Sequence, residues 1–420
     1  MARIARDPRG WLSAQLDDSS LPKPLADLPT AQASMTTTLR RLAEGAERYM
    51  NFLRQEAAQM LRRDAARRTA AAILSPVPFR ERLVHFWSNH FTVSSKRFQI
   101  IAAAGAFERE VIRPRVTGSF TDLLLGSTKH PVMLAYLDNQ QSFGPNSMAG
   151  QRRGVGLNEN LAREILELHT LGVGGGYDQQ DVIGLAKMIT GWGIAQPAEG
   201  SPGGFVFRPQ GHEPGAHAML GKTYAAAGVA QGEAALRDLA RHPATAVFVA
   251  RKMARHFIAD QPDDATIAKL ARTFRDTEGD LRQMALALIA TPELWDEPLS
   301  KFKTPNDLVI STFRALGGID PGDDALIGAL AIFDQFPFSA PSPAGWSDQA
   351  GDWLSPEALM RRIEWGQAVA QRIPVNNPRA LAEDLLGPML GRETRETIAQ
   401  AQSPAEGLAL LFASPEFQRK

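Results

Sequence analysis

Apolar and polar residues follow a helical period along almost the whole chain. Apolar positions that recur every three or four residues lie on one face of a helix, because the α-helix completes a turn in about 3.6 residues. The pattern predicts helices over residues 35–73 (one long or two consecutive helices), 79–91, 99–112, 119–127, 131–137, 158–171, 179–191, 231–241, 244–258, 265–275, 279–291, 305–316, 323–333, 356–372, 377–386 and 404–413. The sequence therefore predicts a mostly α-helical protein.

Two stretches interrupt this pattern. Residues 192–224 are rich in glycine and proline and contain the alternating run "GFVFRP", which predicts an irregular, β-hairpin-like insertion between helices. The later stretch "FPFSAPSPAGWSDQAGDWLSP" is also long and irregular. Loops of this length in a compact domain are usually functional or disordered, and Trp346 and Trp353 favour an ordered loop. Because no internal repeat is present, we expect one large multi-helical domain over residues 1–420.

Composition limits the class of protein. The chain has 420 residues, of which 44% are hydrophobic and 22% charged, as in soluble globular proteins with a well-buried core. It contains no cysteine, which excludes disulfides, cysteine nucleophiles and thiolate metal sites. No window is apolar enough for a membrane span. The start, "MARIARDPRGWLSAQL", lacks the apolar core of a signal peptide, which leads us to expect a cytoplasmic location.

Charge is balanced overall but uneven along the chain. The 46 basic and 46 acidic residues argue against a dedicated nucleic-acid binder. Residues 40–115 hold 15 Lys and Arg against 7 Asp and Glu, an excess of 15 − 7 = 8 positive charges. This excess could form a patch for an anionic partner. Intramolecular ion pairing and solvated arginine faces explain it more simply.

The segment "NENLAREILELHTLGVGGGYDQQDV" concentrates polar side chains on one helix. Asn158 is placed to cap the helix, and Asn160, Arg163, Glu164 and Glu167 form a polar stripe opposite an apolar face. One interpretation is a solvated face with an Arg163–Glu167 pair. In the other, carboxylates three residues apart converge, which raises one pKa and creates an acid–base pair, or binds a divalent cation.

Histidines supply the remaining candidates. His85 and His90 in "RLVHFWSNHFTV" lie about 140° apart on a helix, so the spacing predicts that they do not bind the same metal ion. His90 falls on the apolar face, whereas His85 shares the other face with Asn89. His212 lies in the loop "RPQGHEPGAHAMLGK", where a histidine is a better functional indicator than on a helix. Asp138 is a further candidate metal ligand.

Several of these motifs occur together and in order in one protein family. The blocks "RLVHFWSNHFTVS", "PVMLAYLDNQQS", "NENLAREILELHTLG", "HPATAVFVARKMARHF" and "PSPAGWSDQAGDWLSP" resemble the bacterial family called "domain of unknown function 1800", over residues 8–417. The resemblance implies no established reaction. It implies an association with a sulfatase-like protein of the "domain of unknown function 1501" family, and export of many relatives, which makes the periplasm the alternative location. Such relatives usually carry an additional stretch before the "GWL" motif.

Two functions from different classes follow. The first is a hydrolase that uses clustered carboxylates and histidine, acting on a glycan that stacks on the loop tryptophans. Its candidate catalytic residues are Glu159, Glu164, Glu167, His85 and His212, and its candidate substrate-binding residues are Asn89, Asn158, Asn160, Arg163, Trp346 and Trp353. The sequence requires no cofactor and leaves a divalent cation open. The alternative is a non-catalytic partner or maturation factor for the sulfatase-like protein, with the polar clusters serving as buried networks. A pocket that unites Glu164 and Glu167 with His85 and the His212 loop is expected from the first function.

Overall fold

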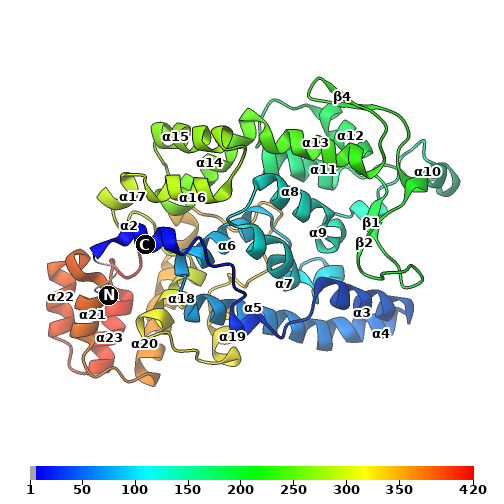
Figure 1. Ribbon diagram of the computed structural model, residues 1–420. Helices are drawn as coiled ribbons and strands as arrows, with labels where there is room; N and C mark the ends of the chain where they lie inside the picture. Colours follow the sequence, from blue (N-terminus) through cyan, green and yellow to red (C-terminus); the bar gives the residue numbers. More distant parts are fainter. Residues whose placement is uncertain (1–5) are drawn as a thin grey trace.

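The computed structural model describes residues 6–420, and it is mostly α-helical, with 62% helix and 4% strand (Figure 1). This confirms the predicted fold class. The helices of the first half are α2 (Pro8–Ala14), α3 (Ala31–Ala43), α4 (Ala46–Phe52), α5 (Ala58–Leu74), α6 (Pro78–His90), α7 (Ala104–Phe107), α8 (Phe120–Lys129), α9 (Pro131–Tyr136), α10 (Met148–Arg153), α11 (Asn160–Glu164) and α12 (Gln179–Met188).

The second half continues as a helical chain. Its helices are α13 (Val229–Arg241), α14 (Pro243–Phe257), α15 (Asp264–Asp276), α16 (Leu281–Ile289), α17 (Glu293–Asp296), α18 (Pro305–Ala315), α19 (Asp323–Ile332), α20 (Pro356–Arg372), α21 (Pro378–Leu386), α22 (Arg392–Ala399) and α23 (Pro404–Ala413). None of the helices in residues 6–420 combines the length and the apolar character that crossing a membrane requires.

All four strands of the described chain lie between residues 192 and 224, as the sequence predicted. β1 (Trp192–Ile194) pairs antiparallel with β2 (Phe205–Phe207), and β3 (His217–Met219) pairs antiparallel with β4 (Lys222–Tyr224). The two ladders are separate and sit at the end of the molecule opposite α21–α23 (Figure 1). The insertion is therefore a pair of short two-stranded ladders.

Two of the predicted helices are not regular along their length. Residues 99–112 contain only the short helix α7, which is followed by a π-helical turn over Glu108–Ile112. Residues 158–171 begin as α11 and change to a π-helical turn over Ile165–Thr170, in which the Thr170 hydroxyl donates to the Ile165 carbonyl at 2.7 Å. A π-turn holds one extra residue, so it shifts the side chains beyond it around the helix axis.

Apolar burial is divided between two large clusters, with a third, small one formed by Phe52, Leu53, Ala57 and Ala102. The larger draws on residues between Leu16 and Ile289, and the smaller draws on α5 together with residues 308–417. Helix α5 turns Ala66, Ala70 and Ile73 into the smaller cluster. The chain thus has two apolar cores, and polar side chains lie where they meet.

A buried ion-pair network occupies part of that region. Arg68 on α5 bonds Glu108 at 2.6 Å, and Arg113 bonds both Glu81 on α6, at 2.9 Å, and Glu108, at 3.2 Å. All four side chains are buried. All four residues belong to residues 40–115, so the network leaves the excess of positive charge in that segment unchanged. Arg67 and Arg97 pair with acidic residues outside it, Asp323 and Asp138.

Candidate functional site

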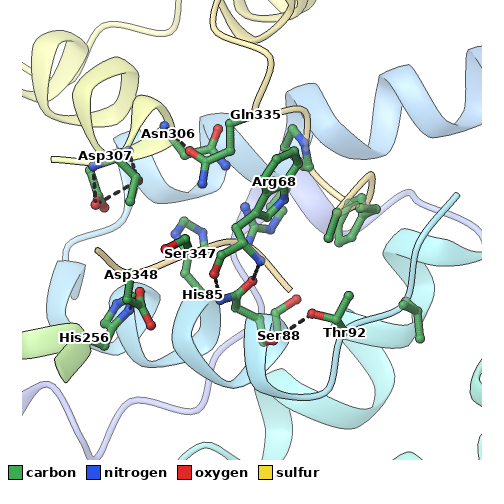
Figure 2. Close-up of a pocket in the computed structure, with 17 residues that line it drawn as sticks. Arg68, His85, Ser88, Thr92, His256, Asn306, Asp307, Gln335, Ser347 and Asp348 are labelled. Atoms are coloured by element: carbon green, nitrogen blue, oxygen red, sulfur yellow. Dashed lines mark hydrogen bonds and ion pairs between the residues drawn. The ribbon is translucent and has the colours of Figure 1, made fainter. Parts of the chain in front are cut away.

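A polar cavity of about 80 Å³ lies between α6, the end of α14, the start of α18 and the long loop at residues 336–355 (Figure 2). A single water molecule needs roughly 10–15 Å³ of such space, so the cavity has room for several. Its polar lining comprises Arg68, His85, Ser88, Asn89, Thr92, His256, Thr304, Asn306, Asp307, Gln335, Ser347 and Asp348. These side chains come from segments that are far apart in the sequence.

His256 and Asp348 form a histidine–carboxylate pair at one end of the cavity (Figure 2). His256 Nδ1 lies 2.6 Å from Asp348 Oδ1. Burial lowers the pKa of His256 even though the Asp348 carboxylate opposes the shift, so the imidazole is neutral at neutral pH. A neutral ring that donates from Nδ1 to the carboxylate keeps Nε2 as a proton acceptor. The pair is therefore arranged as an oriented general base.

The loop that carries Asp348 is fixed to the C-terminal end of α6. The Asn89 amide donates to the Trp346 carbonyl at 2.8 Å, and its Oδ1 accepts from the Trp346 amide at 2.8 Å. Gly345 has a φ of +84°, and a Cβ there would lie 2.5 Å from Asn89 Oδ1. Only glycine allows this close approach without strain. The loop is ordered by these contacts, as its tryptophans suggested.

Asp307 forms a second charged corner of the cavity. It is the third residue of α18, where it completes a capping box with Thr304, and it also bonds Lys420. Burial opposes ionisation of Asp307, but Lys420 and Arg82 outweigh it and hold its pKa far below the ordinary range. Asp307 is therefore an anion at neutral pH, and it does not serve as a general acid there.

Two cavity side chains have unused hydrogen-bonding atoms. His85 Nε2 and Asn306 Oδ1 are buried and have no partner within residues 6–420. Burial and the nearby Arg68 guanidinium lower the pKa of His85 well below its ordinary value, so this ring is neutral too. Buried polar atoms almost always have partners, so such atoms beside a cavity indicate a place for water or a ligand.

The structure brings some of the predicted site residues together. His85, Asn89 and Trp346 line the cavity. Trp353 lies beside Trp346, with ring centroids 6.1 Å apart, and its Nε1 donates to the Ser347 carbonyl at 3.1 Å. His85 and the irregular loop at Trp346 therefore belong to one site, although they are more than 250 positions apart in the sequence.

The polar stripe of residues 158–167 lies elsewhere. Its members Asn158, Glu159, Asn160, Arg163, Glu164 and Glu167 are all absent from the lining of the cavity. Burial raises the pKa of Tyr136, and the charge of Glu164 raises it further. Glu164 therefore lies near Tyr136 on α9, which does not line the cavity. The cavity that contains His85 therefore does not unite it with Glu164, Glu167 or the His212 loop.

Contacts within the stripe are local. Arg163 pairs with Glu159 at 3.0 Å instead of with Glu167, and Gln179 also donates to Glu159, at 2.7 Å. Asn158 Oδ1 accepts from the backbone N–H of Asn160 at 2.9 Å. The N-cap of α11 is Glu159, which makes no side-chain capping bond in the described chain, so the expected cap at Asn158 was wrong by one residue.

The carboxylates of the stripe do influence one another. Burial raises the pKa of Glu164, and the neighbouring charge of Glu167 raises it further. Glu164 therefore has the shifted pKa that the sequence suggested, but it makes no hydrogen bond within residues 6–420 and lies outside the cavity.

The other histidines are held separately. His212 Nδ1 lies 3.0 Å from the Thr190 carbonyl, beside the β1–β2 ladder. His90 is buried and its Nε2 contacts the carbonyl of His169 at 3.0 Å, so its ring is not directed into the cavity with His85. Asp138 pairs with Arg97. Within residues 6–420, no group of three or more His, Asp or Glu side chains is placed to hold a metal ion.

Comparison with known proteins shows the family. The chain matches the model of the family described as "Protein of unknown function (DUF1800)" over residues 2–419, so it belongs to that family. No curated protein and no solved structure matches the chain.

Proposed function

We propose that the protein is a hydrolase whose general base is His256. The observation that carries the proposal is the His256–Asp348 pair at 2.6 Å, which opens on a cavity with room for water. In the proposed step, His256 Nε2 removes a proton from a water molecule as its oxygen attacks the substrate. Asp348 holds the ring in the required tautomer and stabilises the imidazolium that forms.

The side chains of the cavity favour cleavage of an ester or amide bond. Cleavage of a glycosidic bond needs one neutral carboxylic acid and one carboxylate. Both acidic side chains in the cavity, Asp307 and Asp348, are held ionised by neighbouring cations. Arg68 lines the same cavity, and its Nε is bonded to Glu108. We assign the remaining N–H groups of Arg68 to the oxyanion that forms when water adds to a carbonyl.

The tryptophans support a carbohydrate as the part of the substrate that is bound. Both tryptophans are only partly buried; Trp346 lines the cavity, and Trp353 lies beside it with the two rings inclined by 47°. An indole face provides a large apolar surface with a polar edge, which suits the face of a sugar ring. The proposed substrate is therefore an acyl group carried on a glycan.

Activity measurements on variants of the pair test the proposal. Hydrolysis would be screened with O-acetylated and N-acetylated oligosaccharides, and kcat would be compared between the natural protein, His256→Gln and Asp348→Asn. Loss of a general base typically lowers the rate by about 100-fold or more, so both variants should fall by at least that factor. Glu164→Gln is the control, because Glu164 lies outside the cavity, and it should retain full activity.

The outcomes separate catalysis from folding. Melting temperatures of the variants would be measured alongside kcat, because His256 and Asp348 are partly buried. Loss of activity in a variant that still melts cooperatively supports the proposal. Hydrolysis by His256→Gln at the natural rate would reject His256 as the base.

The alternative function, a non-catalytic partner of a sulfatase-like protein, is supported by a different observation. Met360 and Ile363 lie on the outer face of α20 and are 52% and 44% exposed, and Ile332 at the end of α19 is 45% exposed. Arg361 links the two helices through the Ile332 carbonyl. Exposed apolar side chains that gather on one face are typical of an interaction surface. Co-purification with the sulfatase-like protein, and its loss in Met360→Lys, would test this alternative.

A further inference from the structure

A second, cationic cavity adjoins the first and includes neither His256 nor Asp348. It has a volume of about 210 Å³ and is lined by residues of α6 and α18 together with Ala72, Lys303 and Lys420. His85 and Asp307 line both cavities and form the wall between them. The side chains that distinguish the second cavity are Arg82, Lys303, Arg314 and Lys420. Hence four basic side chains converge on one space.

Lys303 is the most unusual of these side chains. It is only 9% exposed, and its Nζ makes no hydrogen bond or ion pair with any residue of the described chain. Its Nζ lies 3.9 Å from the centroid of the Phe417 ring, and the Asp307 carboxylate favours its charge without bonding it. An ammonium group that is largely withdrawn from water and has no protein acceptor is unfavourable. Its Nζ is still reached by solvent, so water or a solute that enters the cavity can supply the acceptor.

Arg82 is a second cation of this cavity that lies against an aromatic ring and has no hydrogen-bond acceptor in the described chain. Its guanidinium stacks on Phe257 at 5.2 Å, its Nε is fully buried, and the group has no hydrogen-bond acceptor within residues 6–420. An arginine has five N–H donors in a planar fork that fits two oxygens of one anion. Two unpartnered cations thus face the same cavity.

The acidic side chains nearby neutralise them only in part, because the Asp307 carboxylate attracts both Arg82 and Lys303 without bonding either. Asp307 is bonded to Lys420, and Glu81 has both carboxylate oxygens bonded to Arg113, each at 2.9 Å. Arg314 already has hydrogen-bond acceptors within the protein, because its Nη1 donates to backbone carbonyls at the end of α5. Arg82 and Lys303 therefore remain as surplus positive charge in a space that could hold a small anion.

From this arrangement we propose that the second cavity binds a small tetrahedral oxyanion, a phosphate or a sulfate, either free or as the head of a monoester. Arg82 donates to two of its oxygens, and Lys303 and Lys420 neutralise its charge. The volume is well above that required by one tetrahedral ion, so the ester carbon of a small monoester also fits. Because the cavity is separate from His256 and Asp348, the inference does not depend on the proposed hydrolysis.

The titration of Lys303 supports the proposal. Burial lowers its pKa to about 7, and the charges of Lys420, Arg82 and Arg362 act in the same direction, against the opposing effect of Asp307. An oxyanion beside the ammonium group would raise that pKa again. Binding at pH 7.5 should therefore be accompanied by proton uptake, because a partly neutral Lys303 becomes fully charged in the complex.

Binding would be measured on the full chain with three probes. Inorganic phosphate, inorganic sulfate and glycerol phosphate would each be titrated at low millimolar concentration, with potassium chloride of equal ionic strength as the blank. We expect at least one probe to bind and to raise the melting temperature. The three arms distinguish a free phosphate, a sulfate and an esterified phosphate as the ligand. If none of the probes exceeds the chloride blank, the proposal is wrong.

Lys303→Met is the decisive variant, and Lys269→Met is its control. Methionine keeps the length of the side chain and removes the charge, so Lys303→Met should weaken binding at least tenfold. Without the anion its melting temperature should equal or exceed that of the natural protein, because an unpaired buried charge has been removed. Lys269 is exposed on α15, so Lys269→Met changes net charge equally and should bind normally. Equal binding by Lys303→Met and Lys269→Met would overturn the proposal.

A second measurement remains decisive if Lys303→Met does not fold. Calorimetric titration of the natural protein with inorganic sulfate at pH 7.5, in two buffers with different enthalpies of ionisation, reports the protons taken up by the protein, because sulfate itself has no proton to exchange at this pH. We expect net uptake of a fraction of one proton per anion. Binding with no proton exchange would contradict the role of Lys303, and binding with proton release would contradict the cationic cavity as the site.

Discussion

Glu108 lies at the centre of the buried network that joins α5 to α6. Burial alone would keep this carboxyl neutral, but the guanidinium groups of Arg68 and Arg113 outweigh it and lower the pKa of Glu108 to about 2. A carboxylate with a lowered pKa in the folded state stabilises the fold above its ordinary pKa, and that contribution is lost as pH falls towards the lowered value. The network should therefore weaken between about pH 5 and pH 2.

Removing one member of this network should be strongly destabilising. Arg113→Met leaves Glu81 buried without the bidentate pair that it has in the natural protein. Breaking a buried ion pair in this way typically costs about 3–5 kcal/mol. We expect a loss of that size in the free energy of unfolding, measured by urea denaturation at pH 7. The exposed Arg272 on α15 provides the control, because Arg272→Met should change stability by less than about 0.5 kcal/mol. A loss below about 1 kcal/mol for Arg113→Met would show that the network is not a stabilising unit.

Glu164 should behave in the opposite way. Its pKa is raised by burial and by Glu167, so its ionised form is disfavoured in the folded protein. The resulting penalty is absent below the ordinary pKa of 4.5 and fully present above the raised one. Glu164→Gln removes the penalty and should stabilise the protein by up to about 0.5 kcal/mol at pH 8, with no difference at pH 4. Thermal unfolding at the two pH values measures this, and destabilisation at pH 8 would indicate a bonded role for the carboxylate.

Sequence pattern located some residues of the site and missed others for a clear reason. His85 and Asn89 were found because they share the polar face of one helix, and the loop tryptophans were found because aromatic residues are rare in irregular stretches. The His256–Asp348 pair joins residues 92 positions apart, so neither has a local signal for the other. The stripe at 158–167 had the strongest local signal, but local spacing cannot say which way a helix face points.

At the scale of elements, helical periodicity was sufficient for long amphipathic helices and insufficient for short ones. The predicted range 356–372 coincides with α20, whereas α2, α10, α17 and α22 were not predicted. These four helices have between four and eight residues, too few turns to establish a period. The π-helical turn within 158–171 also escaped prediction, because one extra residue in a turn leaves no compositional trace.

The loop at residues 336–355 gives a prediction about an element. Gly345→Ala places a Cβ against Asn89 and forces a residue with a side chain to adopt a positive φ. Strain of this kind costs about 1–3 kcal/mol, and the displaced loop carries Asp348. We therefore expect a lower melting temperature and weaker hydrolysis in the same variant. Gly351→Ala in the same loop is the matched control, because no atom lies within 4 Å of its added Cβ. Equal behaviour of the two variants would show that the loop is not held at Gly345.

At the scale of the whole molecule, two apolar cores are joined by polar contacts. Arg68–Glu108, His256–Asp348 and Lys301–Asp260 are the ion pairs that lie along this junction, and both cavities open between the cores. A cavity between two packed bodies combines rigid walls with room for a ligand. Whether the two cores unfold together decides whether the chain is the single domain that its sequence predicts.

Phe412→Ala tests this cooperativity from the smaller core. Phe412 is 2% exposed and packs against Phe417, with centroids 5.1 Å apart. Its removal leaves a cavity that costs about 3–5 kcal/mol. For a chain of this size that loss corresponds to a fall of about 3–6 °C in the melting temperature. Because α5 contributes to the smaller core and its Arg68 reaches the network beside the larger one, we expect a single calorimetric transition that moves as a whole. Phe412→Leu should move it less. A second transition that shifts while the first stays fixed would show that the two cores are separate folding units.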